Sequence, residues 1–206
     1  NYYRLSLKIR VLFFMELIKQ NSQSQFIKSL IIIFLGSILL AISAKVKVPF
    51  YPVPMTMQTF IVLSFGLCFG YKIGLATVIL YLLEGIIGLP VFSNSPEKGV
   101  GLIYFTGPTM GYLIGFLPAV FLAGYFKFDD WTKKESPNVK LFFTNLIKLL
   151  ISVSIIYILG LSWLSNLIGL EKALILGFKP FWIAELFKIL ILAFLIPFIL
   201  KFKKFI

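Results

Sequence analysis

The chain has 206 residues, of which 59% are hydrophobic and only 14% are charged, and its formal net charge is +12. Soluble domains contain about 45–50% apolar residues, so this composition excludes an ordinary soluble protein. The absence of histidine excludes histidine-based catalysis and histidine-ligated zinc, and the single cysteine excludes an intrachain disulfide. An excess of lysine and arginine is typical of the cytoplasmic ends of membrane spans, and the chain has no polar domain to bind nucleic acid.

Long apolar segments predict several membrane-spanning helices joined by short connections. Residues 1–25 alternate basic and apolar side chains, and we expect an interfacial helix or a leader segment here. The six expected spans cover residues 26–44, 56–71, 73–89, 105–126, 141–163 and 181–200. The predicted fold class is therefore an all-α membrane protein, with a six-transmembrane-helix bundle over residues 26–206.

Two of the connections have unusual compositions. Residues 45–55 contain Pro49, Pro52 and Pro54, which favour a stiff, extended segment over a helix. Residues 91–104 form a polar loop that includes Asn94. Because loops commonly open and close binding pockets, we expect these two connections to act as gates.

The distribution of lysine and arginine predicts the orientation in the membrane. With the N-terminus inside, the inner segments contain most of the basic residues that lie outside the spans. Both termini are therefore expected to be cytoplasmic. Lys45 and Lys47 run against this trend, because they fall in an outer loop and require another explanation.

Among the ionisable residues within the expected spans, three stand out: Glu84, Glu185 and Lys188. A charge at the centre of a span costs about 2.5–3.5 kcal/mol on insertion scales, so such residues commonly mark a site or pathway. Glu185 and Lys188 are three residues apart and share one helix face. They form either a mutually neutralising pair or a ligand site in which Lys188 meets an anion and Glu185 accepts hydrogen bonds. Glu84 either faces inward or lies near the outer interface.

Small residues in the first span form a possible contact face. Ser37 and Ala41 are spaced four apart, which permits close approach between helix backbones in lipid. The pair serves either packing inside the bundle or docking on another membrane protein, and the residues alone leave both open.

Four motifs occur in one order across the chain, and together they resemble a known family. These runs are Val48-Pro49-Phe50-Tyr51-Pro52-Val53-Pro54-Met55-Thr56-Met57-Gln58-Thr59-Phe60, Tyr81-Leu82-Leu83-Glu84-Gly85-Ile86-Ile87-Gly88-Leu89-Pro90-Val91-Phe92, Gly107-Pro108-Thr109-Met110-Gly111-Tyr112 and Pro180-Phe181-Trp182-Ile183-Ala184-Glu185-Leu186-Phe187-Lys188. They resemble motifs of the BioY family of biotin transporters. The resemblance covers residues 37–188. It departs from the family pattern at Glu185, where the family usually has aspartate, and at Glu84, which is usually apolar there.

The resemblance implies a substrate-binding S component of an energy-coupling factor (ECF) transporter in a bacterial cytoplasmic membrane. Such a protein binds biotin as its transported ligand, needs no cofactor or metal, and assembles with a membrane coupling protein and two ATPases. The chain carries no GxxxxGK[ST] loop, so ATP hydrolysis by that route requires partners. Ser37 and Ala41 are the nearest match to the family's docking motif. The candidate substrate-binding residues are Gln58, Tyr81, Phe92, Asn94, Tyr112, Glu185 and Lys188.

The chemistry of biotin agrees with this set, because its anion, ureido ring and apolar tail suit a cation, a carboxylate with amides, and aromatic walls. Two other functions compete with biotin uptake. An S component for another small vitamin or metabolite is the alternative, since the loop near Asn94 departs from the glycine-rich loop that is common in the family. An intramembrane enzyme that uses Glu84 or Glu185 is disfavoured, because the spans contain no recurring catalytic motif.

Overall fold

The computed structural model describes residues 2–132 and 138–202 and shows a mostly helical protein. The elements are α1 (Tyr2–Lys45), β1 (Lys47–Val48), β2 (Met55–Thr56), α2 (Gln58–Ile86), the 3₁₀ helix η1 (Gly101–Thr106), α3 (Met110–Tyr125), α4 (Val139–Ile168), α5 (Leu170–Gly177) and α6 (Trp182–Phe202). Among the described residues, four helical stretches are long and apolar enough to cross a membrane, namely Gln23–Lys45, Gln58–Ile86, Val139–Ile168 and Trp182–Lys201. α3 is apolar but shorter.

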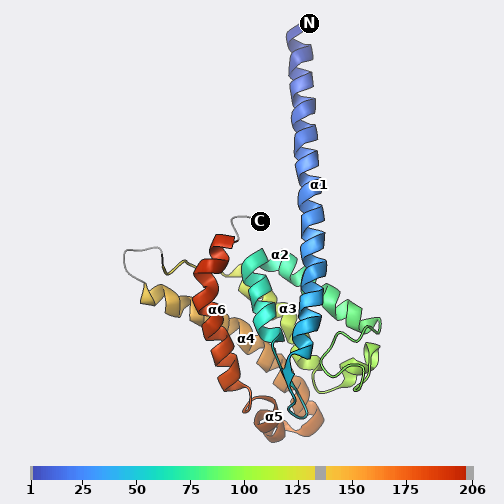
Figure 1. Cartoon of the computed structure of the whole chain (residues 1–206), viewed down its shortest axis with the longest axis vertical. Helices are drawn as coiled ribbons and strands as arrows, with labels where there is room; N and C mark the ends of the chain where they lie inside the picture. The colour runs from blue at the N-terminus through green and yellow to red at the C-terminus, as the bar shows by residue number, and fades with distance from the viewer. Residues whose placement is uncertain (1, 133–137, 203–206) are drawn as a thin grey trace.

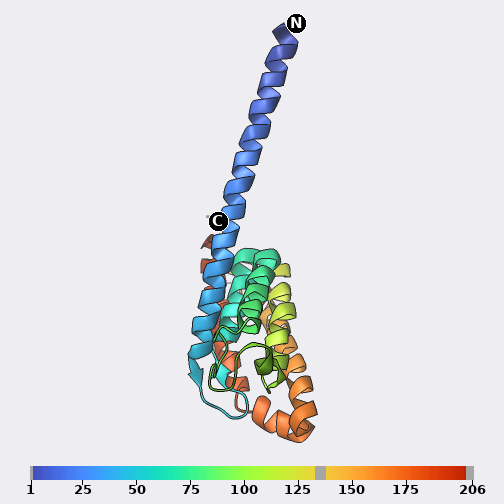
Figure 2. The same ribbon diagram turned by 90° about the vertical axis from the view of Figure 1, so that its right-hand side faces the viewer.

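The first helix is longer than expected. α1 is continuous from Tyr2 to Lys45, so residue 25 is not a helix boundary. Its N-terminal part projects beyond the other helices, as Figure 1 and Figure 2 show. α6 ends on the side of the bundle from which this part of α1 projects. The β1–β2 hairpin and α5 lie on the opposite side (Figure 1).

α2 contains a break at Gly70, close to the turn expected at Lys72. Gly70 has φ 77° and ψ 173°, a conformation that glycine adopts without steric cost. The parts before and after it, residues 58–69 and 71–86, run in different directions (Figure 1). The sequence therefore indicated two segments correctly, although their ends differ by a few residues.

Two other expected boundaries were wrong. The fourth span begins at Met110 rather than residue 105, because Gly107 is extended and separates η1 from α3. The 164–179 connection contains α5, which follows α4 directly after Gly169 in a left-handed conformation (φ 84°). The prolines correctly indicated that residues 49–54 form no helix, but the segment folds back on itself instead of running extended, because β1 and β2 at its two ends pair antiparallel. Part of the hydrophilic 127–140 stretch, including Lys133, Lys134 and Glu135, lies outside the described residues.

Glycine lets α3 approach its neighbours closely. A Cβ atom built on Gly124 would lie 2.2 Å from the backbone nitrogen of Tyr71 in α2, and one on Gly111 would lie 2.4 Å from the carbonyl oxygen of Leu159 in α4. Such contacts suit membrane bundles, where packing rather than a hydrophobic force between helices supplies the association energy. α3 is thereby held between α2 and α4, and this arrangement brings the inner faces of the three helices around one cavity.

We expect Gly124→Ala to destabilise the protein. Alanine normally favours a helix by about 1 kcal/mol over glycine, but here the added methyl group meets backbone that cannot move aside, and overpacking costs about 1–3 kcal/mol. A thermal-unfolding measurement in detergent should show a lower Tm for this variant. Gly107→Ala is the control, because its Cβ would lie 3.1 Å from its nearest neighbour, the carbonyl oxygen of Tyr104. A Tm that is unchanged or raised in Gly124→Ala would contradict the close packing of α2 and α3.

Candidate functional site

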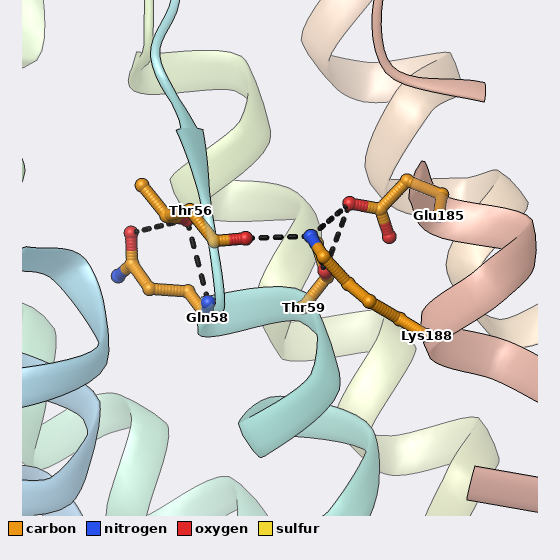
Figure 3. A network of polar contacts seen from close by, with 5 residues as sticks. All are labelled: Thr56, Gln58, Thr59, Glu185 and Lys188. Carbon is orange, nitrogen blue, oxygen red and sulfur yellow. Dashed lines mark hydrogen bonds and ion pairs between the residues drawn. The ribbon is translucent and has the colours of Figure 1, made fainter. Parts of the chain in front are cut away.

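A buried ion pair lies on α6. Lys188 Nζ donates to Glu185 Oε1 at 2.6 Å, and the two residues are 7% and 6% exposed. Their spacing of three residues places both side chains on one face of the helix, where they point toward the start of α2 (Figure 3). The expected pairing of Glu185 with Lys188 is therefore present, and it faces the interior of the bundle.

The remaining donors of Lys188 are occupied by the protein itself. Its Nζ also donates to the carbonyl oxygen of Thr56 at 2.6 Å and to Thr59 Oγ1 at 3.2 Å. The Thr59 hydroxyl in turn donates to Glu185 Oε1 at 3.0 Å (Figure 3). Because an ammonium group has three N–H donors, all three are engaged. The geometry thus makes Lys188 a residue that fixes the Glu185 carboxylate, with no donor left for a ligand anion.

A cavity lies beside this network. It has an empty volume of about 550 Å³, including its open mouth. Its walls come from the proline segment, α2, the 91–109 region, α3, α4 and the start of α6, and its lining residues are Val53, Pro54, Met55, Thr56, Gln58, Thr59, Ser93, Tyr104, Thr109, Tyr112, Leu113, Phe116, Ile156, Tyr157, Phe181 and Glu185. An apolar wall with a few placed polar groups is typical of small-molecule sites.

Two buried polar atoms at this cavity have no hydrogen-bond partner among the described residues: Glu185 Oε2 and Ser93 Oγ. Buried polar atoms are almost always hydrogen-bonded, so an orphan pair at one cavity requires an explanation. Leaving such a group unsatisfied costs about 1–3 kcal/mol. A ligand that offers a donor to the carboxylate and a partner to the hydroxyl would remove that cost.

Gln58 forms the opposite part of the polar lining. Its Nε2 donates to the hydroxyl of Tyr81 at 2.8 Å, and its Oε1 accepts from Thr56 Oγ1 at 3.2 Å. Tyr81 is fully buried behind Gln58, and its ring contacts Phe92 edge-on at 5.3 Å between centroids. Gln58 is therefore held in one orientation by Tyr81, which does not line the cavity, and by Thr56, which does.

The 91–104 loop beside the cavity is held by Lys45 and Lys47, the two lysines that run against the expected charge distribution. Lys45 Nζ donates to the carbonyl oxygens of Phe92 and Ser95, each at 2.8 Å. Lys47 donates to Asn94 Oδ1, and Asn94 adopts the left-handed conformation with φ 60°. These contacts explain why lysines stand at positions 45 and 47, because their ammonium groups satisfy oxygen atoms of the 91–104 loop.

Tyr104, in the 3₁₀ helix η1, also holds this loop. Its hydroxyl donates to the carbonyl oxygen of Ser93. Burial raises the pKa of the Tyr104 phenol, so at neutral pH it remains a neutral donor. Ser93 is consequently held by its backbone while its own side-chain oxygen is left for the cavity.

The structure separates the seven predicted binding residues into two groups. Gln58, Tyr112 and Glu185 line the cavity. The other four stand behind it or beside it: Lys188 and Tyr81 orient lining residues, Phe92 packs in an aromatic cluster, and Asn94 lines separate hollows with Lys98.

Sequence reasoning missed several residues that line the cavity. Thr56 and Thr59 lie in the same motif as Gln58, residues 48–60, so they could have been predicted to line the site with it. Ser93 directly follows the motif that ends at Phe92 and could have been predicted in the same way. Tyr157 had no such signal, because it lies in α4 outside every motif and reaches the cavity only through helix packing.

Of the two small residues predicted as a docking pair on α1, Ser37 serves internal packing. Ser37 is fully buried and donates to Glu84 Oε1 at 2.8 Å, so its side chain is not on an exposed docking face and that expectation was wrong. Glu84 is half-buried against α1 and thus faces inward. Ala41 is half-buried, and exposed Ile38 and Ile42 flank it.

Known proteins are similar in sequence to nearly the whole chain. A sequence profile described as the BioY family matches residues 16–205. The chain belongs to the BioY family. This BioY match begins within the segment that the motif resemblance had left out, and it includes every residue of the cavity.

Curated relatives agree with this membership of the BioY family. A protein named "Probable biotin transporter BioY" from Pyrococcus horikoshii is 34% identical over 160 residues, covering 78% of this chain and 87% of the relative. The "Biotin transporter BioY" of Thermotoga maritima is 36% identical over 156 residues, covering 75% and 85%. A relative from Rickettsia prowazekii is 27% identical and covers 98% of both chains.

A solved structure has the same fold. It is a crystal structure described as the S-component for biotin from an ECF-type ABC transporter. The superposition has a TM-score of 0.68 at 28% sequence identity and covers 86% of this chain and 93% of the other.

Proposed function

We propose that this chain binds biotin and takes it up across the cytoplasmic membrane as the substrate-binding S component of an ECF-type transporter. Its BioY membership, the names of its relatives and the description of the solved structure support this proposal. The chain is then a transport protein, and hydrolysis of ATP falls to separate partner ATPases, which act through a membrane coupling protein.

The observation that carries the proposal is the pair of unsatisfied atoms at the cavity, Glu185 Oε2 and Ser93 Oγ. A carboxylate accepts hydrogen bonds and repels another carboxylate, so Glu185 faces the ureido N–H groups of biotin and not its valerate anion. The Ser93 hydroxyl donates to the ureido carbonyl oxygen or accepts from the second N–H. The apolar tail of biotin then lies along the walls formed by Phe116 and Ile156.

In this arrangement Lys188 acts on the ligand through Glu185. Its three bonds to Thr56, Thr59 and Glu185 hold the carboxylate with Oε2 free. Lys188 is therefore a positioning residue for the ureido contact.

The membrane arrangement we propose is a six-span bundle with both termini cytoplasmic. The break in α2 at Gly70 supports counting residues 58–69 and 71–86 as two segments, and α3 as a further span beside α1, α4 and α6. The common end shared by the projecting part of α1 and the end of α6 supports placing both termini on one side (Figure 1). The cavity then lies toward the outer side, near the two gate loops.

The gates are the 45–55 and 91–104 connections. Both contribute to the lining of the cavity, through Met55 and Ser93 among others. Docking of the coupling protein is proposed for the exposed face of α1 around Ala41, whose apolar neighbours Ile38 and Ile42 are 40% and 55% exposed.

The test is equilibrium binding of biotin to the purified full chain in detergent or nanodiscs, without partner proteins. Saturable binding that biotin, but not unrelated vitamins, competes away supports the proposal. Absence of binding by folded protein would overturn it. Displacement by a different vitamin at lower concentration than biotin would identify the alternative S-component function instead.

A substitution at Ser93 separates ligand contact from structure. Because Ser93 Oγ has no protein partner, Ser93→Ala should leave the Tm of the ligand-free protein unchanged or slightly raised. Loss of one neutral hydrogen bond of about 0.5–1.5 kcal/mol should raise the Kd for biotin by about two- to tenfold. Isothermal titration calorimetry measures the Kd, and thermal unfolding measures the Tm.

Ser95→Ala is the matched control, because the Ser95 hydroxyl donates to the Phe92 carbonyl oxygen and lines no part of the cavity. Equal Kd values for wild type and Ser93→Ala would contradict the ligand contact.

A further inference from the structure

A second hollow lies outside the wall of the cavity, between α4 and α6. It is a groove whose floor includes Tyr157 and Glu185, the two residues that also line the inner cavity. Its rims are apolar, with Ile158 on α4 and Trp182 and Leu186 on α6. Tyr157 and Glu185 therefore separate a ligand cavity from a groove on the outer surface of the bundle.

The groove faces the bilayer. α4 and α6 are both long and apolar enough to cross a membrane, so the surface between them is bounded by lipid or by another membrane protein. The rim side chains of Ile158, Trp182 and Leu186 are 60%, 49% and 38% exposed, as lipid-facing residues are. Water is not a suitable occupant, because an apolar groove offers it few hydrogen-bond partners.

The dimensions of the groove match one leaflet. Its lining on α4 runs from Leu150 to Leu161, which at the helical rise is about 16 Å. Half of a typical hydrocarbon core is about 15 Å. The groove follows the middle of α4, which runs from Val139 to Ile168, and the α5 end of α6, which begins at Trp182.

A cation stands at the end of the groove where a headgroup would lie. Phe178 lines the groove, and exposed Lys179 follows it in the connection between α5 and α6. Trp182 is at the first residue of α6, the level at which tryptophan is enriched at membrane interfaces. An exposed lysine near the membrane surface attracts an anionic headgroup by about 1 kcal/mol.

We propose that this groove is a lipid site, which takes one acyl chain of an anionic phospholipid from the leaflet nearest α5, with its headgroup beside Lys179. The chain covers the outer side of Tyr157 and Glu185. It thereby closes the lipid side of a wall that is one side chain thick. This site differs from the biotin cavity in its occupant, and it does not depend on the identity of the transported ligand.

The test uses phosphatidylglycerol that carries a diazirine in the middle of one acyl chain. The full chain is placed in nanodiscs that contain a small fraction of this probe, irradiated without biotin, and analysed by mass spectrometry. We expect labelling at Ser154 and Leu186 to exceed labelling at Ile147 by at least severalfold, although Ile147 is 54% exposed on the same helix and lies outside the groove. The matching phosphatidylcholine probe should label the groove less strongly.

Three variants test the assignment further. Ser154→Trp fills the groove and should abolish its labelling, whereas Ile147→Trp adds the same side chain outside the groove and should leave the labelling intact. Lys179→Gln should remove the preference for the anionic probe. Labelling that follows exposed area alone, or groove labelling that persists in Ser154→Trp, would overturn the proposal. Labelling that disappears in the native membrane and returns in isolated protein would show that a protein covers the groove, and it would overturn the lipid assignment too. Biotin binding, measured separately, has no part in these outcomes.

Discussion

Lys188→Met is expected to raise the Kd for biotin by 30-fold or more. The substitution removes all three donors that hold Glu185 and the start of α2, and it leaves a buried carboxylate without its counter-charge. Losing one partner of a buried, hydrogen-bonded charge pair costs roughly 2–5 kcal/mol, and each 1.4 kcal/mol is about a tenfold change in affinity. Isothermal titration calorimetry on the purified chain measures this change.

A comparison of two ligands separates positioning from direct contact. If Lys188 acts through Glu185, biotin and its methyl ester should lose affinity by the same factor in Lys188→Met. If Lys188 instead bound the valerate anion, the substitution would lower the affinity for biotin but leave the affinity for the ester unchanged. That outcome would contradict the positioning role of Lys188.

The double variant Lys188→Met/Glu185→Leu provides the stability control. Replacing a buried ion pair by apolar residues of similar volume is often neutral or stabilising, whereas removing one partner is costly. We therefore expect the double variant to recover the Tm that Lys188→Met loses, without recovering biotin binding. Recovery of both would mean that the pair has a purely structural role.

Glu185→Gln is expected to raise the Kd for biotin by about 10- to 150-fold. The amide oxygen of glutamine can replace Oε1 and keep the bonds from Thr59 and Lys188. Its nitrogen then replaces the unsatisfied Oε2 and presents N–H donors where the ligand is expected to donate. A hydrogen bond to a charged group contributes about 1.5–3 kcal/mol, which sets the size of the loss.

A ureido-methylated biotin analogue tests which end of the ligand this carboxylate meets. The analogue lacks an N–H donor, so it should bind wild type more weakly than biotin does. In Glu185→Gln the two ligands should bind with similar affinity, because the contact is already lost. A full additional loss for the analogue in the variant would place Glu185 away from the ureido ring. Thr106→Val, on an exposed residue that lines no part of the cavity, serves as the control.

Hydropathy, together with the positions of proline and glycine, predicted most of the membrane-spanning segments. Pro49, Pro52 and Pro54 correctly excluded a helix from residues 49–54, and the break at Gly70 falls near the expected turn. The errors arose where local composition is ambiguous. α5 is short and amphipathic, so its sequence reads equally as a loop, and the start of α3 depends on the extended conformation of Gly107.

The site could be predicted in part for a similar reason. A charged pair in an apolar span is visible in the sequence, so Glu185 and Lys188 were identified together. Their division of roles was not, because it depends on Thr56 and Thr59 arriving from the start of α2 to occupy the ammonium group. Tyr157 and Ser37 show the same limit, since only helix packing places one at the cavity and the other against Glu84.

The contacts of Lys45 and Lys47 have a consequence for the timing of transport. Both lysines lie at the start of the proline segment, and both are bonded to the 92–95 stretch of the second loop. The two connections over the cavity are thus linked, and neither moves far without breaking several bonds of the other. We expect them to open in one concerted step, which makes both entry and escape infrequent events. Under the proposed function, such coupling lengthens the residence time of each captured biotin molecule, so that the chain retains it until the energising partner proteins engage.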